Sequence, residues 1–151
     1  MNREWGTPSE EHSPEVFHVL RKMDQEGCDL FIDVHGDEVL PYNFIAGAEG
    51  IPKWGPRLQE LQDSFSATFM RHSPDFQDEH GYPTDAAGEA NLNIASNAVA
   101  ERFECLAFTL EQPFKDTVDD PDTEQGWSPE RAMRFGAAIL GAISDVAPKL
   151  R

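Results

Sequence analysis

Apolar residues recur with helical spacing in separate segments of the chain. Ser13-Pro14-Glu15 is typical of a helix start, because serine suits the N-cap, proline the first turn and an acid the positive end of the helix. The apolar residues that follow predict a helix that ends at Gly27. The same spacing predicts further helices over residues 56–71, over residues 92–103, and from Ser128-Pro129-Glu130 to about residue 147.

Short apolar runs between the helices predict strands. Residues 30–34 read Leu-Phe-Ile-Asp-Val and follow a helix and a glycine, which is typical of a buried strand in an α/β fold. Residues 42–46 and 105–111 predict two more strands. Segments 73–88 and 116–124 are rich in acidic and turn-forming residues, and we expect them to be loops. The chain has no internal repeat, and its 151 residues suit a single α/β domain.

The composition of the chain is strongly acidic. Its 28 Asp and Glu residues against 12 Lys and Arg give a formal charge of −16. Nucleic acid and anionic membranes both require clustered positive charge, so neither is expected as a partner. The longest apolar run, residues 136–143, is far shorter than the roughly 20 residues of a membrane span, and residues 1–10 lack the apolar stretch of a signal peptide. These features predict a cytoplasmic protein.

Two chemically useful side chains stand at the ends of predicted strands. His35 follows the strand of residues 30–34, and Glu111 closes that of residues 105–111. Strand ends are where ligands gather in open α/β sheets, and there a histidine can bind zinc while a glutamate moves protons to and from water. Asp33, on the same strand face as His35, could orient a ligand. A single strand-end histidine is more often a hydrogen-bonded structural residue, so this pair alone does not identify a metal site.

Five short stretches occur in the order in which a known family has them. They are Asn2-Arg3-Glu4-Trp5, residues 33–38 (Asp-Val-His-Gly-Asp-Glu), Pro41-Tyr42-Asn43-Phe44, Gly47-Ala48-Glu49-Gly50 and residues 109–114 (Thr-Leu-Glu-Gln-Pro-Phe). Together they resemble the zinc carboxypeptidases of the M14 family, with the closest likeness to bacterial members related to cytosolic carboxypeptidases. The likeness extends over nearly the whole chain and implies an α/β fold with a mixed, mostly parallel sheet and helices on both faces.

The resemblance implies a role for each candidate residue. His35 matches the family's third zinc ligand, and Glu111 matches the glutamate that acts as general base and then general acid. Asn2 and Arg3 match the pair that holds the terminal carboxylate of the substrate, a group that a guanidinium can bind bidentately. Tyr82 lies in a loop ahead of the glutamate, where the family has a tyrosine that closes over substrate. The implied cofactor is one Zn²⁺, and the implied substrates are peptides or proteins with a free C-terminus.

The first zinc motif of the family, His-x-x-Glu, has no counterpart ahead of the Asn2-Arg3 pair, where only Met1 stands. His12-Ser13-Pro14-Glu15 has the right letters, but it follows the pair and coincides with a helix start. We therefore expect residues 1–151 to be the C-terminal portion of one catalytic domain whose first two ligands lie upstream. A catalytic zinc needs about three protein ligands, so the chain alone is expected to be inactive. The sheet edge exposed by such a cut predicts self-association.

Two other functions fit parts of the pattern. A zinc deacylase of the aspartoacylase and succinylglutamate desuccinylase kind is similar in fold and zinc arrangement, and the Asn2-Arg3 pair is compatible with it. Pro41-Tyr42-Asn43-Phe44 and residues 110–114 favour the peptidase. A non-catalytic acidic binding module is the third possibility, in which Asn2 and Arg3 form a surface pair and Tyr82 packs in a simple turn. Zinc titration would separate these functions, because either enzyme at full length should bind zinc tightly and the module should not.

Overall fold

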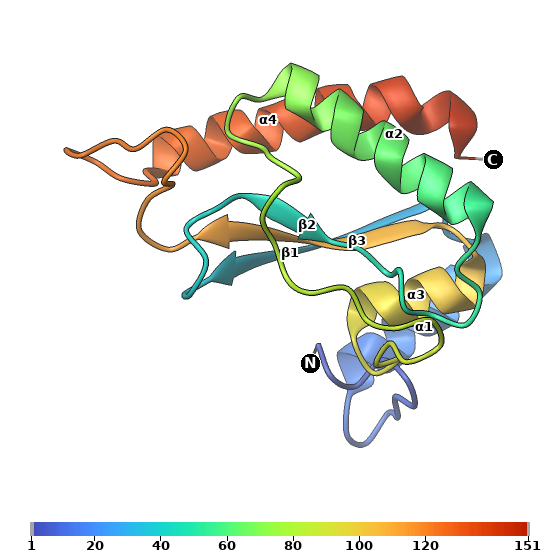
Figure 1. Cartoon of the computed structure of the whole chain (residues 1–151). Coiled ribbons are helices and arrows are strands. Elements are labelled where there is room, and N and C mark those ends of the chain that lie inside the picture. The colour runs from blue at the N-terminus through green and yellow to red at the C-terminus, as the bar shows by residue number, and fades with distance from the viewer. Residues whose placement is uncertain (1, 151) are drawn as a thin grey trace. The chain divides into compact units, whose positions relative to one another are not determined.

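The computed structural model of the chain describes residues 2–150 (Figure 1). The expectation that the chain is the C-terminal portion of a longer domain concerns Met1, and this residue lies outside the described residues. Helices and strands alternate along the chain, and the predicted α/β class is confirmed. Among residues 2–150, no helix combines the length and the apolar character that crossing a membrane requires.

In order, the elements are α1 (Pro14–Glu26), β1 (Leu30–Asp37), β2 (Phe44–Ala46), α2 (Pro56–His72), α3 (Ala95–Phe103), β3 (Leu106–Pro113), α4 (Pro129–Val146) and the short 3-10 helix η1 (Ala147–Lys149).

The chain forms two compact units. Within the described residues, unit 1 comprises residues 2–33, 47–59 and 84–109. Unit 2 comprises residues 34–46, 60–83 and 110–150. β1 and β3 contribute their first halves to unit 1 and their second halves to unit 2. α1 and α3 belong to unit 1, whereas β2, α4 and most of α2 belong to unit 2.

α1 packs one apolar face into unit 1. Val16 and Leu20, four residues apart, are its buried side chains, as the helical spacing predicts. The start of this helix differs from the prediction, because Ser13 makes no side-chain cap. Its hydroxyl instead accepts a hydrogen bond from the Ser9 N–H at 3.2 Å and so serves the preceding turn. The helix stops before Gly27, whose φ of 85° is a conformation that a residue without Cβ adopts most readily.

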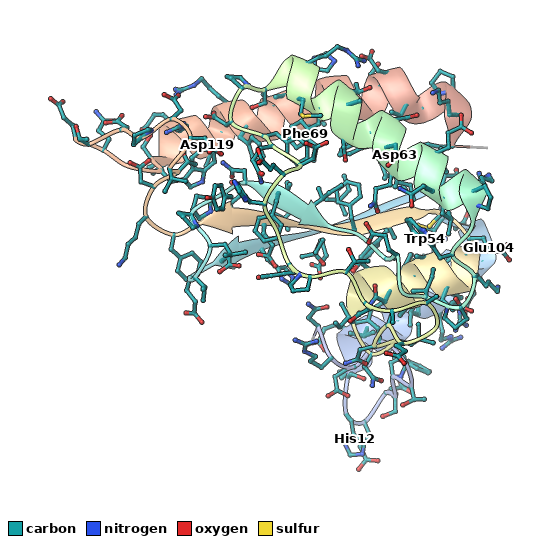
Figure 2. All side chains as sticks on the ribbon, in the orientation of Figure 1. His12, Trp54, Asp63, Phe69, Glu104 and Asp119 are labelled. Carbon is teal, nitrogen blue, oxygen red and sulfur yellow. The ribbon has the colours of Figure 1, made fainter. Side chains whose placement is uncertain are left out.

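Unit 2 contains the second halves of β1 and β3 together with β2. The strand order is β1-β3-β2; β1 and β3 point in the same direction and β2 in the opposite one (Figure 1). The sheet is therefore mixed, as predicted. α4 and the unit 2 part of α2 lie along one face of this sheet, and Phe69 lies on the side of α2 that faces it (Figure 2). Phe69 anchors this layer, because its ring centroid lies 4.5 Å from that of Phe76 and 4.9 Å from that of Phe135.

β1 and β3 run further than their apolar residues predict. The predicted strands end at residues 34 and 111, but β1 extends to Asp37 and β3 to Pro113. Backbone pairing explains the extension, because the Phe114 N–H donates to the Asp37 carbonyl oxygen at 3.1 Å, and such bonds do not depend on side-chain polarity. His35 and Glu111 thus stand inside strands of the sheet, which fixes their backbone positions.

Candidate active site

His35 and Glu111 meet where β1 and β3 run side by side in unit 2. The His35 Nδ1 atom lies 3.7 Å from the Glu111 Oε1 atom. Both residues belong to neighbouring strands that point the same way (Figure 1). The Glu111 side chain is 7% exposed and the His35 side chain 30%. The carboxylate is therefore largely shielded from water, while part of the imidazole can still be reached from solvent.

Tyr82 brings a hydroxyl to the same place. This hydroxyl donates a hydrogen bond to Asp37 Oδ2 at 2.5 Å and lies 3.5 Å from Glu111 Oε1. The Tyr82 ring packs edge-on against Phe44 with the ring centroids 5.0 Å apart. Gly81 allows this close approach, because a Cβ at that position would lie 3.0 Å from the Phe44 ring. Packing and hydrogen bonding together hold the tyrosine at the site.

Asp37 connects the tyrosine to the end of β1. Its Oδ1 atom accepts hydrogen bonds from the N–H groups of Val39 and Leu40 at 2.5 and 3.1 Å. Burial alone would raise the pKa of Asp37, but the bonds from Tyr82 and from these backbone groups outweigh it and hold the pKa below its ordinary value. Burial and the bond to Asp37 raise the pKa of Tyr82, so the phenol keeps its proton at neutral pH. Asp37 was not among the predicted site residues, although it follows His35 at strand spacing on the same face.

We expect Tyr82→Phe to lower the free energy of unfolding of the chain by about 1–3 kcal/mol at pH 7, because the buried Asp37 carboxylate loses a hydrogen bond. Urea unfolding measures this loss. A carboxyl with a lowered pKa in the folded state adds stability above its unfolded pKa of about 3.9, and that stability disappears as the pH falls through the folded value. The difference between wild type and variant should therefore shrink below about pH 4.

Tyr42→Phe is the matched control for this variant. The Tyr42 ring packs against His80 at an interplanar angle of 31°, and its hydroxyl makes no hydrogen bond that the structure gives within residues 2–150. Removing the same atom there should change stability by less than about 0.5 kcal/mol. Equal losses in the two variants would argue against the bond between Tyr82 and Asp37.

Asn2, Arg3 and Asp33 belong to unit 1. The Asn2 Oδ1 atom accepts a hydrogen bond from the N–H of Ala95, the first residue of α3, at 2.9 Å. It thus satisfies one of the backbone donors that a helix start leaves open. Arg3 is exposed, and Asp33 is half-buried in β1. The structure brings the other three predicted residues together in unit 2 and leaves these three in unit 1.

The described residues do not form a complete metal site. Residues 2–150 contain no group of three or more His, Cys, Asp or Glu side chains placed to hold one ion. A catalytic zinc takes about three protein ligands and keeps one position open. His35 fits as one ligand of such a set, because its imidazole is partly accessible and stands beside a carboxylate that could act on a neighbouring water.

A separate cluster of charges in unit 2 surrounds Arg131 in the first turn of α4. The Arg131 side chain is 7% exposed, and its Nε and Nη2 atoms donate to Asp75 Oδ1 at 2.9 and 2.6 Å. Carboxylate oxygens of Asp120 and Asp116 lie 3.3 and 3.6 Å from the guanidinium, and the Trp127 ring centroid lies 5.1 Å from its central carbon. The hydrogen bond with Asp75 raises the pKa of Arg131, so the cation is firmly charged.

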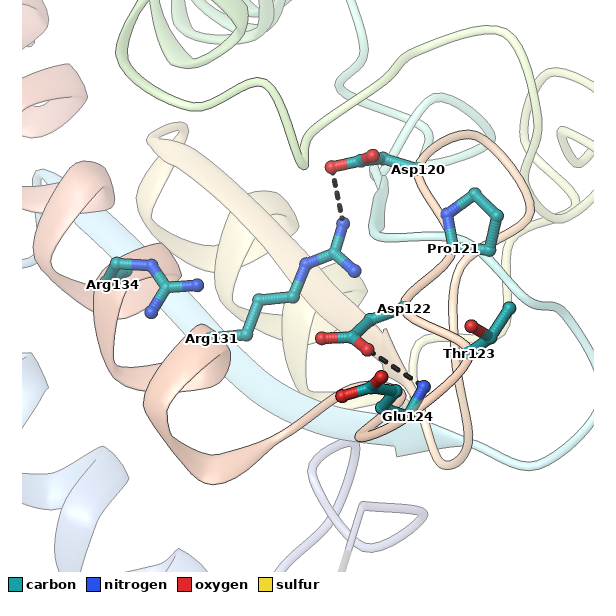
Figure 3. Close-up of a pocket in the computed structure, with 7 residues that line it drawn as sticks. All are labelled: Asp120, Pro121, Asp122, Thr123, Glu124, Arg131 and Arg134. Atoms are coloured by element: carbon teal, nitrogen blue, oxygen red, sulfur yellow. Dashed lines mark hydrogen bonds and ion pairs between the residues drawn. The ribbon is translucent and has the colours of Figure 1, made fainter.

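This ion pair has a structural consequence for the candidate site. Asp75 stands at the start of the loop that carries Tyr82, so Arg131 fixes the first part of that loop while Asp37 holds its tyrosine. The pocket next to Arg131 includes neither His35 nor Glu111 and is separate from the candidate site (Figure 3). Its lining residues are Asp120, Pro121, Asp122, Thr123, Glu124, Arg131 and Arg134.

Comparison with known proteins relates the chain to bacterial carboxypeptidases. No protein-family model matches it. An uncharacterised protein of Zymomonas mobilis is 43% identical over 150 residues, which cover 99% of this chain and 40% of that protein. A Shewanella denitrificans protein provisionally named carboxypeptidase A has a crystal structure that matches with a TM-score of 0.95 and 55% identity, over 98% of this chain and 39% of that one. A metallo-carboxypeptidase from Pseudomonas aeruginosa, solved in complex with (2-guanidinoethylmercapto)succinic acid, matches with a TM-score of 0.96 and 46% identity, over 99% of this chain and 40% of that one.

The chain spans about 40% of the length of these relatives. Over that span it has a carboxypeptidase-like fold, and the predicted resemblance to carboxypeptidases is confirmed at this level. Because 98% or more of the chain is matched, the similarity includes the strands that carry His35 and Glu111.

Proposed function

We propose that the protein containing this chain is a zinc-dependent metallocarboxypeptidase, which hydrolyses the C-terminal peptide or isopeptide bond of a peptide or protein with a free C-terminus. The observation that carries the proposal is the 3.7 Å approach of His35 Nδ1 to Glu111 Oε1, with the Tyr82 hydroxyl 3.5 Å from the same oxygen. The carboxypeptidase-like fold supports it, as does the name of the Pseudomonas aeruginosa relative.

Glu111 is the group that moves protons in this proposal. Zinc, when bound, supplies positive charge that polarises the scissile carbonyl and favours ionisation of water. The Glu111 carboxylate accepts a proton from the attacking water and then delivers it to the nitrogen of the leaving group. Because the side chain is only 7% exposed, few other water molecules compete for that proton. Tyr82 keeps its own proton, but its hydroxyl could donate that proton to an oxygen that develops negative charge only by giving up its bond to Asp37.

The other candidate residues bind and orient. His35 is proposed as one zinc ligand, and the remaining ligands are proposed to come from a part of the protein outside these 151 residues, because residues 2–150 form no complete set. Arg3 is proposed to bind the terminal carboxylate of the substrate through its guanidinium, with Asn2 beside it in the sequence. Asp33, two positions before His35 on β1, is proposed to orient the His35 side chain as a zinc ligand.

A chimera tests this function. The part of the Pseudomonas aeruginosa metallo-carboxypeptidase that matches this chain, 40% of that protein, is replaced by the present 151 residues. The zinc-loaded chimera is expected to release the last residue from peptides with a free C-terminus and to leave the same peptides intact when they end in an amide. The 151-residue chain mixed with zinc is expected to release nothing, because its residues 2–150 offer an incomplete set of ligands.

Zinc content and thermal unfolding of the chimera provide the controls for assembly. A chimera that unfolds cooperatively, holds one zinc per chain and still fails to cleave would contradict the proposed function. Robust release of terminal residues by the 151-residue chain alone would contradict the proposal that further ligands lie outside it.

A further inference from the structure

The two cysteines of the chain meet in unit 1. Cys28 lies in the connection between α1 and β1, and Cys105 immediately precedes β3, which is the neighbour of β1 in the sheet. Both thiols are free. Phe114 pairs with Asp37 across β3 and β1, 77 positions apart, and the same spacing relates Cys105 to Cys28, so the register of these neighbouring strands brings the two cysteines side by side. The Cys28 sulfur also lies 3.4 Å from the Leu30 carbonyl oxygen, which places this side chain at the start of β1. Residues far apart in sequence thus bring their sulfurs together at one end of two adjacent strands.

The two thiols differ in accessibility and in acidity. Cys28 is half-buried, whereas Cys105 is 3% exposed. The hydrogen bond from Cys105 lowers the pKa of Cys28, and the same bond together with burial raises the pKa of Cys105. A partly accessible cysteine whose pKa is lowered, placed beside a second thiol, is the arrangement that responds to oxidants, since the thiolate is the nucleophile.

We propose that Cys28 and Cys105 form a reversible oxidation site, at which a hydroperoxide converts the two thiols into an intramolecular disulfide. In the first step, the Cys28 thiolate attacks one oxygen of the hydroperoxide, the O–O bond breaks, and Cys28 becomes a sulfenic acid as water or an alcohol leaves. In the second step, the Cys105 sulfur attacks the Cys28 sulfur, a disulfide forms and one water leaves. Sulfur is oxidised and peroxide oxygen reduced, and a dithiol restores the original pair.

The disulfide would link the connection after α1 to the start of β3. Gly27, whose φ of 85° a residue without Cβ adopts most readily, directly precedes Cys28 and allows the chain to turn toward the sheet there. Neither cysteine belongs to the residues proposed for hydrolysis, so the oxidation site is independent of the proposed function.

Peptide mapping of the intact chain tests the site. The folded chain is treated with hydrogen peroxide, the remaining thiols are alkylated, and the digest is analysed by mass spectrometry. We expect a cross-linked peptide pair containing Cys28 and Cys105, about 2 Da lighter than the sum of its reduced parts, which dithiothreitol converts back. The same treatment in urea should give at least about tenfold less of this pair, because the unfolded chain does not hold the thiols together.

Single-cysteine variants identify the order of the two steps. Cys105→Ala should accumulate a Cys28 sulfenic acid that dimedone traps, and Cys28→Ser should leave Cys105 at least about tenfold slower to oxidise than Cys28 in the wild type. Circular dichroism before oxidation checks that each variant is folded. The cross-link in the wild-type chain tests the site even if a variant fails to fold. Cross-links only between chains, a pair that forms as well in urea, or a Cys105 that reacts as fast without Cys28 would each overturn the proposal.

Discussion

Glu111→Gln in the zinc-loaded chimera is expected to lower the kcat for release of a C-terminal residue by about 10²- to 10⁴-fold. Glutamine preserves the size of the side chain and its place in β3, but it cannot accept a proton from water at neutral pH. The zinc content should be unchanged, because the glutamate is proposed to act on water without binding the metal. Steady-state kinetics and metal analysis on the same preparation measure both quantities.

Glu89→Gln is the matched control for this change. Glu89 is an exposed residue outside the candidate site, and the substitution removes the same charge from the chain. The kcat of the Glu89→Gln chimera should stay within about twofold of that of the parent chimera, because substitutions at exposed positions away from the site have small effects. A Glu111→Gln chimera that retains more than about a tenth of the activity would remove Glu111 from the role of general base.

Arg131→Met is expected to lower the free energy of unfolding of the chain by about 3–5 kcal/mol. The substitution keeps most of the side-chain volume but leaves the Asp75 carboxylate, whose side chain is 12% exposed, without its cation. An unpaired carboxylate in such a place is costly, and the neighbouring Asp116 and Asp120 add repulsion once the guanidinium is gone. Urea unfolding followed by circular dichroism measures the loss.

Arg134→Met separates this effect from the change in net charge. Arg134 is exposed on the same helix, so the same substitution there removes one positive charge without breaking a buried pair. Its effect should stay within about 0.5 kcal/mol. The double variant Arg131→Met with Asp75→Asn should recover part of the loss, since it removes the uncompensated charge as well. Equal destabilisation by the two arginine variants would show that the buried pair contributes little.

The fold class could be predicted because local patterns and tertiary packing agree over most of the chain. Val16 and Leu20 are buried at the spacing that predicted α1, and Ser128 caps α4 by accepting a hydrogen bond from the Arg131 N–H at 3.3 Å. Ser13 has the same sequence context as Ser128 but serves the turn before its helix, and one sequence pattern cannot distinguish the two outcomes. The lengths of β1 and β3 were underestimated, because backbone pairing between these strands continues through polar residues such as Asp37.

Local patterns predicted candidate site residues only at strand ends, whereas Tyr82 was predicted from the family resemblance. His35 and Glu111 close two apolar runs, and the structure places them 3.7 Å apart, while their chemical roles stay predictions. Asp37 was missed because its importance comes from a partner 45 positions away, Tyr82, in a loop whose path no local pattern determines. The pairing of Cys28 with Cys105 was missed for the same reason, because only the alignment of β1 with β3 brings them together.

The most direct test of the proposed function is a crystal structure of the zinc-loaded chimera, with the metal located by anomalous scattering. We expect a bond of about 2.0–2.1 Å between the zinc and a ring nitrogen of His35, with the Glu111 carboxylate hydrogen-bonded to a water on the metal and not bound to the metal itself. Zinc bound away from His35, or a Glu111 side chain turned away from the metal, would contradict it.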